Sequence, residues 1–152
     1  MTTAAAEGFI DAMVATFKAS ELLAGVTVYD GPEIDASDPS VWLAVGHDGT
    51  EDGEVIAFNT KNEYKQLGAK SMFEEGYINC VLDVWNGDTN ISSLRTQARQ
   101  YVSAVDTIIR LDPSFGGIVL WSGLDSQTLS YNQTTSGAEV KIVFTIYYKA
   151  RT

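Results

Sequence analysis

The chain has 152 residues, of which 45% are hydrophobic and 20% charged, and its formal net charge is −10. These values indicate one soluble globular domain over residues 1–152. The acidic balance argues against a protein that binds nucleic-acid phosphates or docks on anionic lipid. The single cysteine, Cys80, excludes an intrachain disulfide. We therefore expect a protein made in a reducing cytoplasm, with no membrane contact.

The first half of the chain predicts one helix followed by short strands. Apolar residues recur with helical spacing over 4–23, and Gly25 marks the end of this helix. The range 60–76 is polar and without a clean period, so it is expected to be an extended arm or a long strand connection. Runs of β-branched and aromatic residues indicate strands at 26–32, 41–46 and 54–59, with a Pro-containing loop at 32–40.

The second half predicts a half-buried strand, a long helix and three more strands. Alternation in 77–85 places Ile78, Cys80, Leu82 and Val84 on one face. An apolar stripe with helical spacing runs through 89–113, and strands are expected at 117–123, 127–134 and 138–151. Because the strands are grouped and do not alternate with helices, the sequence predicts an α+β fold. In that fold a mostly antiparallel sheet packs against the N-terminal helix and the long central helix.

The predicted sheet carries apolar residues on both faces. Val81 and Trp85 lie opposite the main apolar face of strand 77–85, and Val143 and Tyr147 lie on the otherwise polar face of the last strand. Two helices cover only one face, so this second face needs more chain or another subunit to cover it. A folded-back arm at 60–76 and self-association account for the pattern equally well.

The stretch GHDGTEDGE at 46–54 holds His47, the only histidine, among several carboxylates. Asp48, Thr50, Asp52 and Gly53 match the start of a calcium loop, but the twelfth position is Asn59 where a bidentate Glu is required. Zinc would need further His or Cys ligands. The stretch is therefore predicted to be a solvated hairpin tip without a metal, which serves at most as a contact surface.

The sequence contains no pattern that supports catalysis. A serine or cysteine nucleophile needs a base, and His47 is the only histidine, while Cys80 falls on the buried face of its strand. The pair Glu74–Glu75 has no partner that fixes its geometry. FGGIV at 115–119 is not followed by a helix, so it is not a dinucleotide-binding loop. We expect neither enzymatic activity nor a cofactor.

Four blocks of the sequence together resemble a known family. VTVYDGP, EEGYINCVLDVWNGDT, LRTQARQYVSAVDTIIRLDPSFGG and YNQTTSGAEVKIVFTIYYKAR resemble, in order and spacing, the tail terminator (tail completion) proteins of long-tailed bacteriophages, especially those of actinobacterial hosts. The blocks cover nearly the whole chain. The resemblance implies an α+β subunit of a hexameric ring that caps the finished tail tube and joins it to the neck of the head, without catalysis.

The resemblance also implies partners: other copies of the chain, the tail tube protein, and a head-completion or neck protein, with DNA passing through an acidic lumen without specific binding. The location would be the virion, and the host cytoplasm during assembly. From their predicted loop or helix positions we expect contacts at the hairpin tip, the arm and the long helix. The candidate residues are His47, Asp48, Glu51, Asp52, Tyr64, Phe73, Glu74, Glu75, Arg95 and Arg99.

Two other classes of protein fit the same sequence. Head-closure and adaptor proteins of the neck are similar in size and also lack enzyme motifs. A cellular α+β domain that binds a small molecule, with the 46–54 cluster as its polar anchor, is the alternative from a different class. Arg95, Arg99 and Arg110 either pair with acidic groups across a subunit boundary or lie on a solvated helix face.

Overall fold

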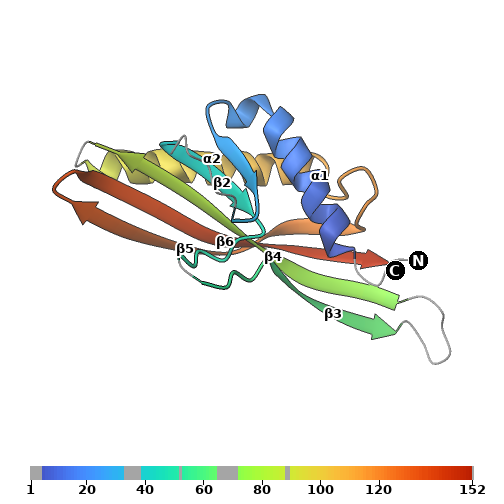
Figure 1. Cartoon of the computed structure of the whole chain (residues 1–152). Coiled ribbons are helices and arrows are strands. Elements are labelled where there is room, and N and C mark those ends of the chain that lie inside the picture. The colour runs from blue at the N-terminus through green and yellow to red at the C-terminus, as the bar shows by residue number, and fades with distance from the viewer. Residues whose placement is uncertain (1–4, 33–38, 52, 65–71, 88–89, 152) are drawn as a thin grey trace.

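The computed structural model describes residues 5–32, 39–51, 53–64, 72–87 and 90–151. These residues form the predicted α+β fold, in which a mixed sheet of six strands carries two α-helices on one face (Figure 1). The elements in chain order are α1 (Ala6–Ala19), the 3-10 helix η1 (Glu21–Leu23), β1 (Thr27–Asp30), β2 (Val41–Val45), β3 (Phe58–Tyr64), β4 (Met72–Asn86), α2 (Ile91–Leu111), β5 (Trp121–Thr134) and β6 (Gly137–Arg151).

The sheet is built around two long antiparallel strands, β4 and β6. The strand order is β1-β2-β4-β6-β5, and β3 pairs with the part of β4 that β2 leaves free. Only the β1–β2 pair is parallel; the other described pairs are antiparallel, as the sequence predicts. Thus β2 and β3 lie one after the other along the same side of β4.

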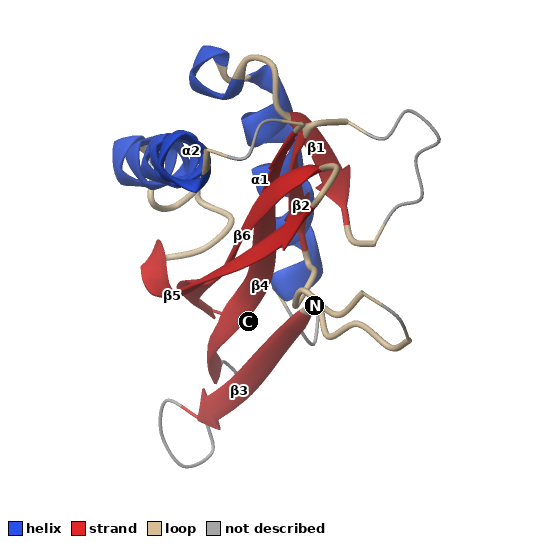
Figure 2. Cartoon of the chain, turned by 90° about the vertical axis from the view of Figure 1, so that its left-hand side faces the viewer, coloured by secondary structure: helices blue, strands red, loops and turns tan. Residues whose placement is uncertain are grey.

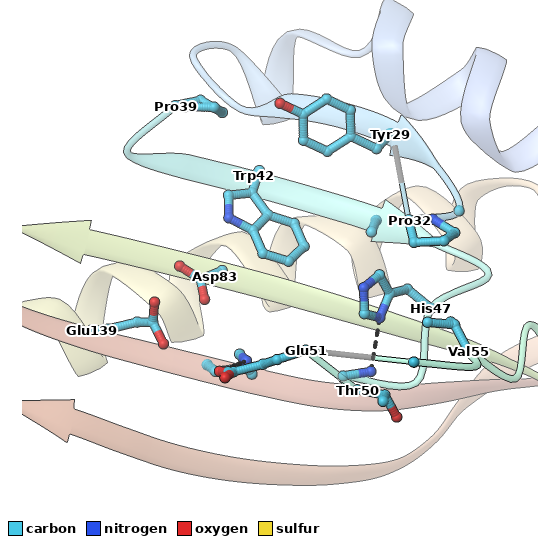
Figure 3. Close-up of a pocket in the computed structure, with 15 residues that line it drawn as sticks. Tyr29, Pro32, Pro39, Trp42, His47, Thr50, Glu51, Val55, Asp83 and Glu139 are labelled. Carbon is cyan, nitrogen blue, oxygen red and sulfur yellow. Dashed lines mark hydrogen bonds and ion pairs between the residues drawn. The ribbon is translucent and has the colours of Figure 1, made fainter. Parts of the chain in front are cut away.

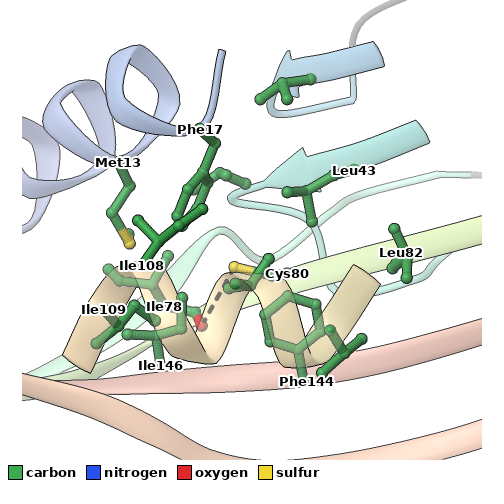
Figure 4. Close-up of a cluster of buried hydrophobic side chains, with 14 of the residues drawn as sticks. Met13, Phe17, Leu43, Ile78, Cys80, Leu82, Ile108, Ile109, Phe144 and Ile146 are labelled. Atoms are coloured by element: carbon green, nitrogen blue, oxygen red, sulfur yellow. Dashed lines mark hydrogen bonds between the residues drawn. The ribbon is translucent and has the colours of Figure 1, made fainter. Parts of the chain in front are cut away.

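The core lies between the helices and one face of β4 and β6 (Figure 4). The predicted alternation is confirmed, because Ile78, Cys80, Leu82 and Val84 are all buried on this face. They pack against alternate residues of β6, against the apolar stripe along α2 and against the apolar side of α1. The helix residues in this core include Phe9, Met13, Phe17, Leu94, Ala98, Val102, Val105 and Ile109.

The two helices are shorter than predicted because their ends are set by local hydrogen bonds. In α2, the side chain of Asn90 accepts a hydrogen bond from the backbone N–H of Ser93, which starts the helix. The predicted helix 4–23 is divided. Ser20 is extended, and its hydroxyl accepts from the N–H of Leu22, so α1 ends at Ala19 and η1 follows.

Two predictions for strand boundaries are wrong. The third strand, predicted at 54–59, begins only at Phe58. The range 60–76, predicted as an extended arm or a strand connection, contains most of β3 and the start of β4, which pair from Phe58–Ile78 to Tyr64–Met72. The hairpin lacks a clear apolar period because β3 is exposed over nearly its whole length. Residues 117–120 are not strand; β5 starts at Trp121 and runs as one strand across a register shift between Leu124 and Gln127.

The prediction of a hairpin at 46–54 is also wrong, because β2 and β3 do not pair with each other. The chain leaves the sheet after β2 and passes over its second face, the side opposite the helices (Figure 2). Gly49 lies so close to this face that an added Cβ would be 2.8 Å from Cγ2 of Val143 and 3.8 Å from Cγ2 of Val81. The loop 46–57, which the structure describes except for residue 52, therefore covers the centre of the second face at Gly49, whereas β3 only extends the sheet.

Candidate functional site

A cavity of about 600 Å³ lies on the second face, beside the loop 46–57. Its walls come from β1, β2 and the loop, and its floor comes from β4 and β6 (Figure 3). Tyr29, Trp42 and His47 lie along one side of the cavity, and Asp83 and Glu139 lie below them. The cavity thus combines aromatic and carboxyl groups from five separate segments of the chain.

Strand register places the polar floor of the cavity. Trp42 of β2 is the cross-strand partner of Asp83, which in turn is the partner of Lys141 of β6. Glu139 lies two residues before Lys141 on the same face. Asp83 is only 3% exposed, and its carboxyl group shares a hydrogen bond with that of Glu139. A carboxyl pair, in which Asp83 is buried and Glu139 is partly exposed, therefore forms the floor of the cavity.

The electrostatics of this floor follow from burial and from the neighbouring carboxylates. Burial raises the pKa of the Asp83 carboxyl to about 7, and Glu139 adds to the rise while Lys141 opposes it. The ammonium of Lys141 is mostly buried and lies 3.1 Å from Oε1 of Glu51, which is exposed. Because the pKa of Asp83 is near 7, its carboxyl group is protonated for part of the time near neutral pH.

His47 is fixed in the wall of the cavity. Its Nδ1 accepts a hydrogen bond from the backbone N–H of Gly49 at 2.9 Å, and its ring centroid is 6.2 Å from that of Trp42. Burial lowers the pKa of His47; Asp48 opposes this shift and Lys141 adds to it. With Nδ1 as an acceptor, the neutral imidazole carries its proton on Nε2.

Asp48 holds the loop and does not line the cavity. Its two carboxylate oxygens accept hydrogen bonds from the backbone N–H groups of Thr50 and Ile56 at 2.9 and 3.1 Å. Hydrogen bonds from Thr50 lower the pKa of the Asp48 carboxyl. Asp52 lies outside the described residues. Within the residues that are described, no three His, Cys, Asp or Glu side chains are placed to hold a metal ion.

A second feature of this face is a row of three aromatic rings, Tyr77, Tyr147 and Trp121, which we call the aromatic strip; Tyr147 in its centre is partly buried, and the two outer rings are exposed. The ring centroid of Tyr147 is 5.6 Å from that of Tyr77 and 5.5 Å from that of Trp121. Tyr77 is 42% exposed and Trp121 52% exposed. Gly123 leaves room for the Trp121 ring, since an added Cβ would lie 3.1 Å from it.

Cationic groups border the aromatic strip. Lys149 and Arg151 of β6 lie over the ring of Phe73, at 4.9 and 5.7 Å from its centroid. Glu75 accepts a hydrogen bond from the hydroxyl of Tyr147 at 2.9 Å. Of the predicted contact residues, Phe73 and Glu75 therefore belong to this surface.

Two residues of the predicted arm have opposite environments. Tyr64, at the end of β3, is 69% exposed. Glu74 is fully buried, and its carboxylate accepts hydrogen bonds from the N–H of Ala5 and the hydroxyl of Tyr148. The sequence suggested that Glu74 is an exposed contact residue, and this prediction is wrong. Glu74 anchors the start of α1 to the sheet.

The arginines of α2 make contacts within the chain. A terminal nitrogen of Arg95 donates to the hydroxyl of Tyr131 at 2.9 Å, and Arg99 donates to the side-chain oxygen of Gln127. Both contacts join the solvent side of α2 to β5. Within this chain Arg95 and Arg99 thus contact neutral side chains, whereas Arg110 pairs with Asp106 of the same helix at 3.0 Å. Pairing with acidic groups across a subunit boundary stays a prediction.

The sequence analysis missed four residues that build the cavity: Trp42, Asp83, Glu139 and Lys141. Asp83 carried a usable signal, because it is a lone charge inside the apolar strand 77–85. Its grouping with Glu139 and Lys141 depends on the register of β4 and β6, which is a long-range pairing that no local pattern specifies.

Comparison with known proteins finds no protein family and no curated protein that matches this sequence. Among the described residues, no helix is long and apolar enough to cross a membrane.

Proposed function

We propose that the chain is a tail terminator, a structural protein of a long-tailed bacteriophage that acts without catalysis. In this proposal it forms a hexameric ring that caps the tail tube, ends tail elongation and joins the tail to the neck of the head. Its partners are other copies of itself, the tail tube protein and a head-completion protein. It resides in the virion, and in the host cytoplasm during assembly.

The observation that carries the proposal is the uncovered aromatic strip. Loop 46–57 covers the centre of the second face, but Tyr77 and Trp121 remain about half exposed. Tyrosine and tryptophan are enriched in the cores of protein interfaces, where they bury a large area at a small cost in conformational entropy. A surface of this kind favours a protein partner over a role as an isolated monomer.

Charge favours a second copy of the chain as that partner. Lys149 and Arg151 lie beside the strip, although the whole chain carries a net charge of −10. A neighbouring copy presents mostly carboxylates, so a local cationic border would attract it and orient it. The remaining acidic surface would let DNA pass through a ring without sticking to it.

The β3–β4 hairpin supports contacts beyond one subunit. In β3, all residues after Phe58 are exposed, and this strand extends past the part of β4 that pairs with β2 (Figure 1). The β4 half of this hairpin pairs with β6, but the side chains of β3 after Phe58 are exposed, which suits this strand to contact a neighbour, the tube or the neck. Tyr64, at its end, is the exposed aromatic residue that such a contact would bury.

Another neck or head-closure protein is the nearest alternative. A small-molecule-binding domain is the alternative from a different class, and the cavity beside His47 specifically favours it. Such a domain would be monomeric or dimeric and would lose its ligand when His47 and Asp52 are changed. A terminator would form rings and would fold equally well with both changes.

The test is capping of tail tubes assembled from the tube protein of the same phage. Gold-labelled chain is expected at one end of each tube, with about six copies per end, and its presence during assembly should prevent further elongation. A variant with Tyr77→Ser and Trp121→Ser is expected to fold but to lose capping, while Tyr131→Ser, an exposed aromatic residue away from the strip, keeps it. Chain that ignores tube ends, or that coats tubes along their length, would contradict the proposal.

A further inference from the structure

The contacts argued above for the proposed function leave out the cavity beside His47, which has the composition of a binding site. We propose that it binds an organic cation, with a guanidinium or ammonium head group seated between the Trp42 ring and the Asp83–Glu139 carboxyl pair. The cavity lies within one chain, so this inference does not rest on the proposed function.

The charged groups that line the cavity favour a cationic ligand over an anionic one. Asp83, Glu139 and Glu51 contribute three carboxyl groups to the cavity, and Lys141 contributes one ammonium group. Asp83 lines the cavity but is only 3% exposed, and its burial and the neighbouring Glu139 carboxyl group favour a proton on Asp83. A guanidinium or ammonium head group would supply both hydrogen-bond donors and positive charge at that point, and so would replace the proton.

The aromatic wall favours an organic cation over a hydrated metal ion. The Trp42 ring lies between Tyr29 and His47, with centroids 6.2 Å from each. A cation over the face of a tryptophan ring is attracted by the ring's quadrupole, and its alkyl portion gains apolar contact. The cavity volume of about 600 Å³ lies within the range of roughly 300–1,000 Å³ that small-molecule sites occupy.

The cavity wall is held in place without a ligand. The backbone N–H groups of Gly46 and His47 both donate to the carbonyl of Asn79, at 2.7 and 3.0 Å. The side-chain amide of Asn79 donates in turn to the carbonyl of Ile56 at 3.0 Å. Loop 46–57 is thus fixed to β4 at two points, so little ordering is needed when a ligand binds.

The experiment is a titration of the full chain, followed by the NMR resonances of the Trp42 indole N–H and the Gly49 amide. Methylguanidinium and butylammonium are the cationic probes, methylurea is the neutral isostere, and butyrate is the anion. We expect saturable shifts with both cations at about 1–10 mM, an affinity usual for fragments of this size. Methylurea and butyrate should produce none.

Variants separate the cavity from the rest of the second face. Asp83→Asn and Glu139→Gln should each weaken methylguanidinium binding by about tenfold or more, because each removes a charge-assisted contact. Glu75→Gln, on the same face but outside the cavity, should bind as the wild type does. Lys141→Met should retain binding of the cation, whereas a site for anions would lose its anchor.

Affinity should also depend on pH. The charged and titratable groups around Asp83 are Glu139 and Lys141 on β6, and Glu51 and His47 from the loop. Because a bound cation replaces the proton of the carboxyl pair, binding should tighten by up to about tenfold per pH unit between about pH 6 and 7. The dependence should disappear in Asp83→Asn, whose folding is verified by its unfolding transition.

A peptide that carries one arginine among neutral residues tests whether the cation belongs to a partner protein or to a free metabolite. If a partner protein supplies the head group, this peptide should bind at least about tenfold more tightly than methylguanidinium; if the ligand is a free metabolite, it should not. The proposal is overturned if neither cation shifts the Trp42 indole resonance at about 50 mM. Preferential binding of butyrate, or unchanged binding in folded Asp83→Asn, would overturn it equally.

Discussion

Glu74 and Glu75 are adjacent on β4 but have opposite roles, because successive side chains of a strand point to opposite faces. The carboxylate of Glu74 points into the core, where it accepts from Ala5 and Tyr148. Burial and this carboxylate raise the pKa of the Tyr148 hydroxyl well above its ordinary value. Glu75 points to the second face, where it contacts Tyr147.

We expect Glu74→Gln to lower the free energy of unfolding by about 1–3 kcal/mol, because an amide NH₂ would face a backbone N–H or the Tyr148 hydroxyl and leave a buried donor unsatisfied. Glu75→Gln is the matched control and should change this free energy by less than about 0.5 kcal/mol. Urea unfolding followed by circular dichroism measures both. Equal effects of the two substitutions would show that the anchor of α1 is not energetically important.

Gly49 must be glycine for two reasons. Its φ is +90°, and an added Cβ would lie 2.8 Å from Val143. Gly53 in the same loop has φ +99° but open space around it.

We expect Gly53→Ala to lower the free energy of unfolding by about 1 kcal/mol, through backbone conformation alone. Gly49→Ala should lower it by at least about 1 kcal/mol more, because its overlap with Val143 adds to that cost. Thermal or urea unfolding of both variants compares them, and similar losses would mean that the loop does not press on the second face.

Asp83 makes stability depend on pH. Its folded-state pKa of about 7 is above its ordinary value of 3.8, so between these values the folded chain binds more protons than the unfolded chain. The contribution of Asp83 to stability is therefore full below about pH 4 and is lost as the pH rises to about 7. We expect Asp83→Asn to gain stability relative to the wild type by more than about 1 kcal/mol between pH 4 and 8. Urea unfolding at both pH values tests this, and a constant difference between the two proteins would contradict it.

At the level of elements, local patterns predicted the parts that bury one regular face. Strand 77–85 and helix 89–113 were found because their apolar residues recur with the period of their element. β3 was missed because most of its residues are exposed and it has no apolar period to detect. The path of loop 46–57 was missed because it depends on Val81 and Val143, which are distant in sequence.

The exposure of β3 and the burial of β4 and β6 predict that backbone amides along the sheet are unevenly protected from exchange with solvent. β3 pairs only with β4 and contributes few buried side chains, whereas β4 and β6 form the centre of the sheet. We expect the amides of β3 to exchange with solvent much faster than those of β4 residues 78–84 in the free chain. Hydrogen–deuterium exchange detected by mass spectrometry measures this. Protection of β3 should rise when a partner binds the hairpin, and equal protection in the free chain would remove the argument that it is available for contacts.

For the whole molecule, the second face divides into three regions with different roles. The loop 46–57 covers its centre, the cavity with Asp83 lies beside the loop, and the aromatic strip remains open. Apolar residues on both faces of the predicted strands indicated that this face needed a cover, and the loop supplies only part of it. The aromatic strip, including Tyr77 and Trp121, is the part that another subunit would cover in the proposed ring.

The most direct test of self-association is the native mass of the chain over a range of concentrations, with negative-stain images of the same samples, in the presence and absence of tail tubes. We predict closed rings of about six subunits, and their loss in the variant with Tyr77→Ser and Trp121→Ser, which should remain folded. Tyr131→Ser should still form rings. A chain that stays monomeric at every concentration, both alone and with tail tubes, would contradict the account.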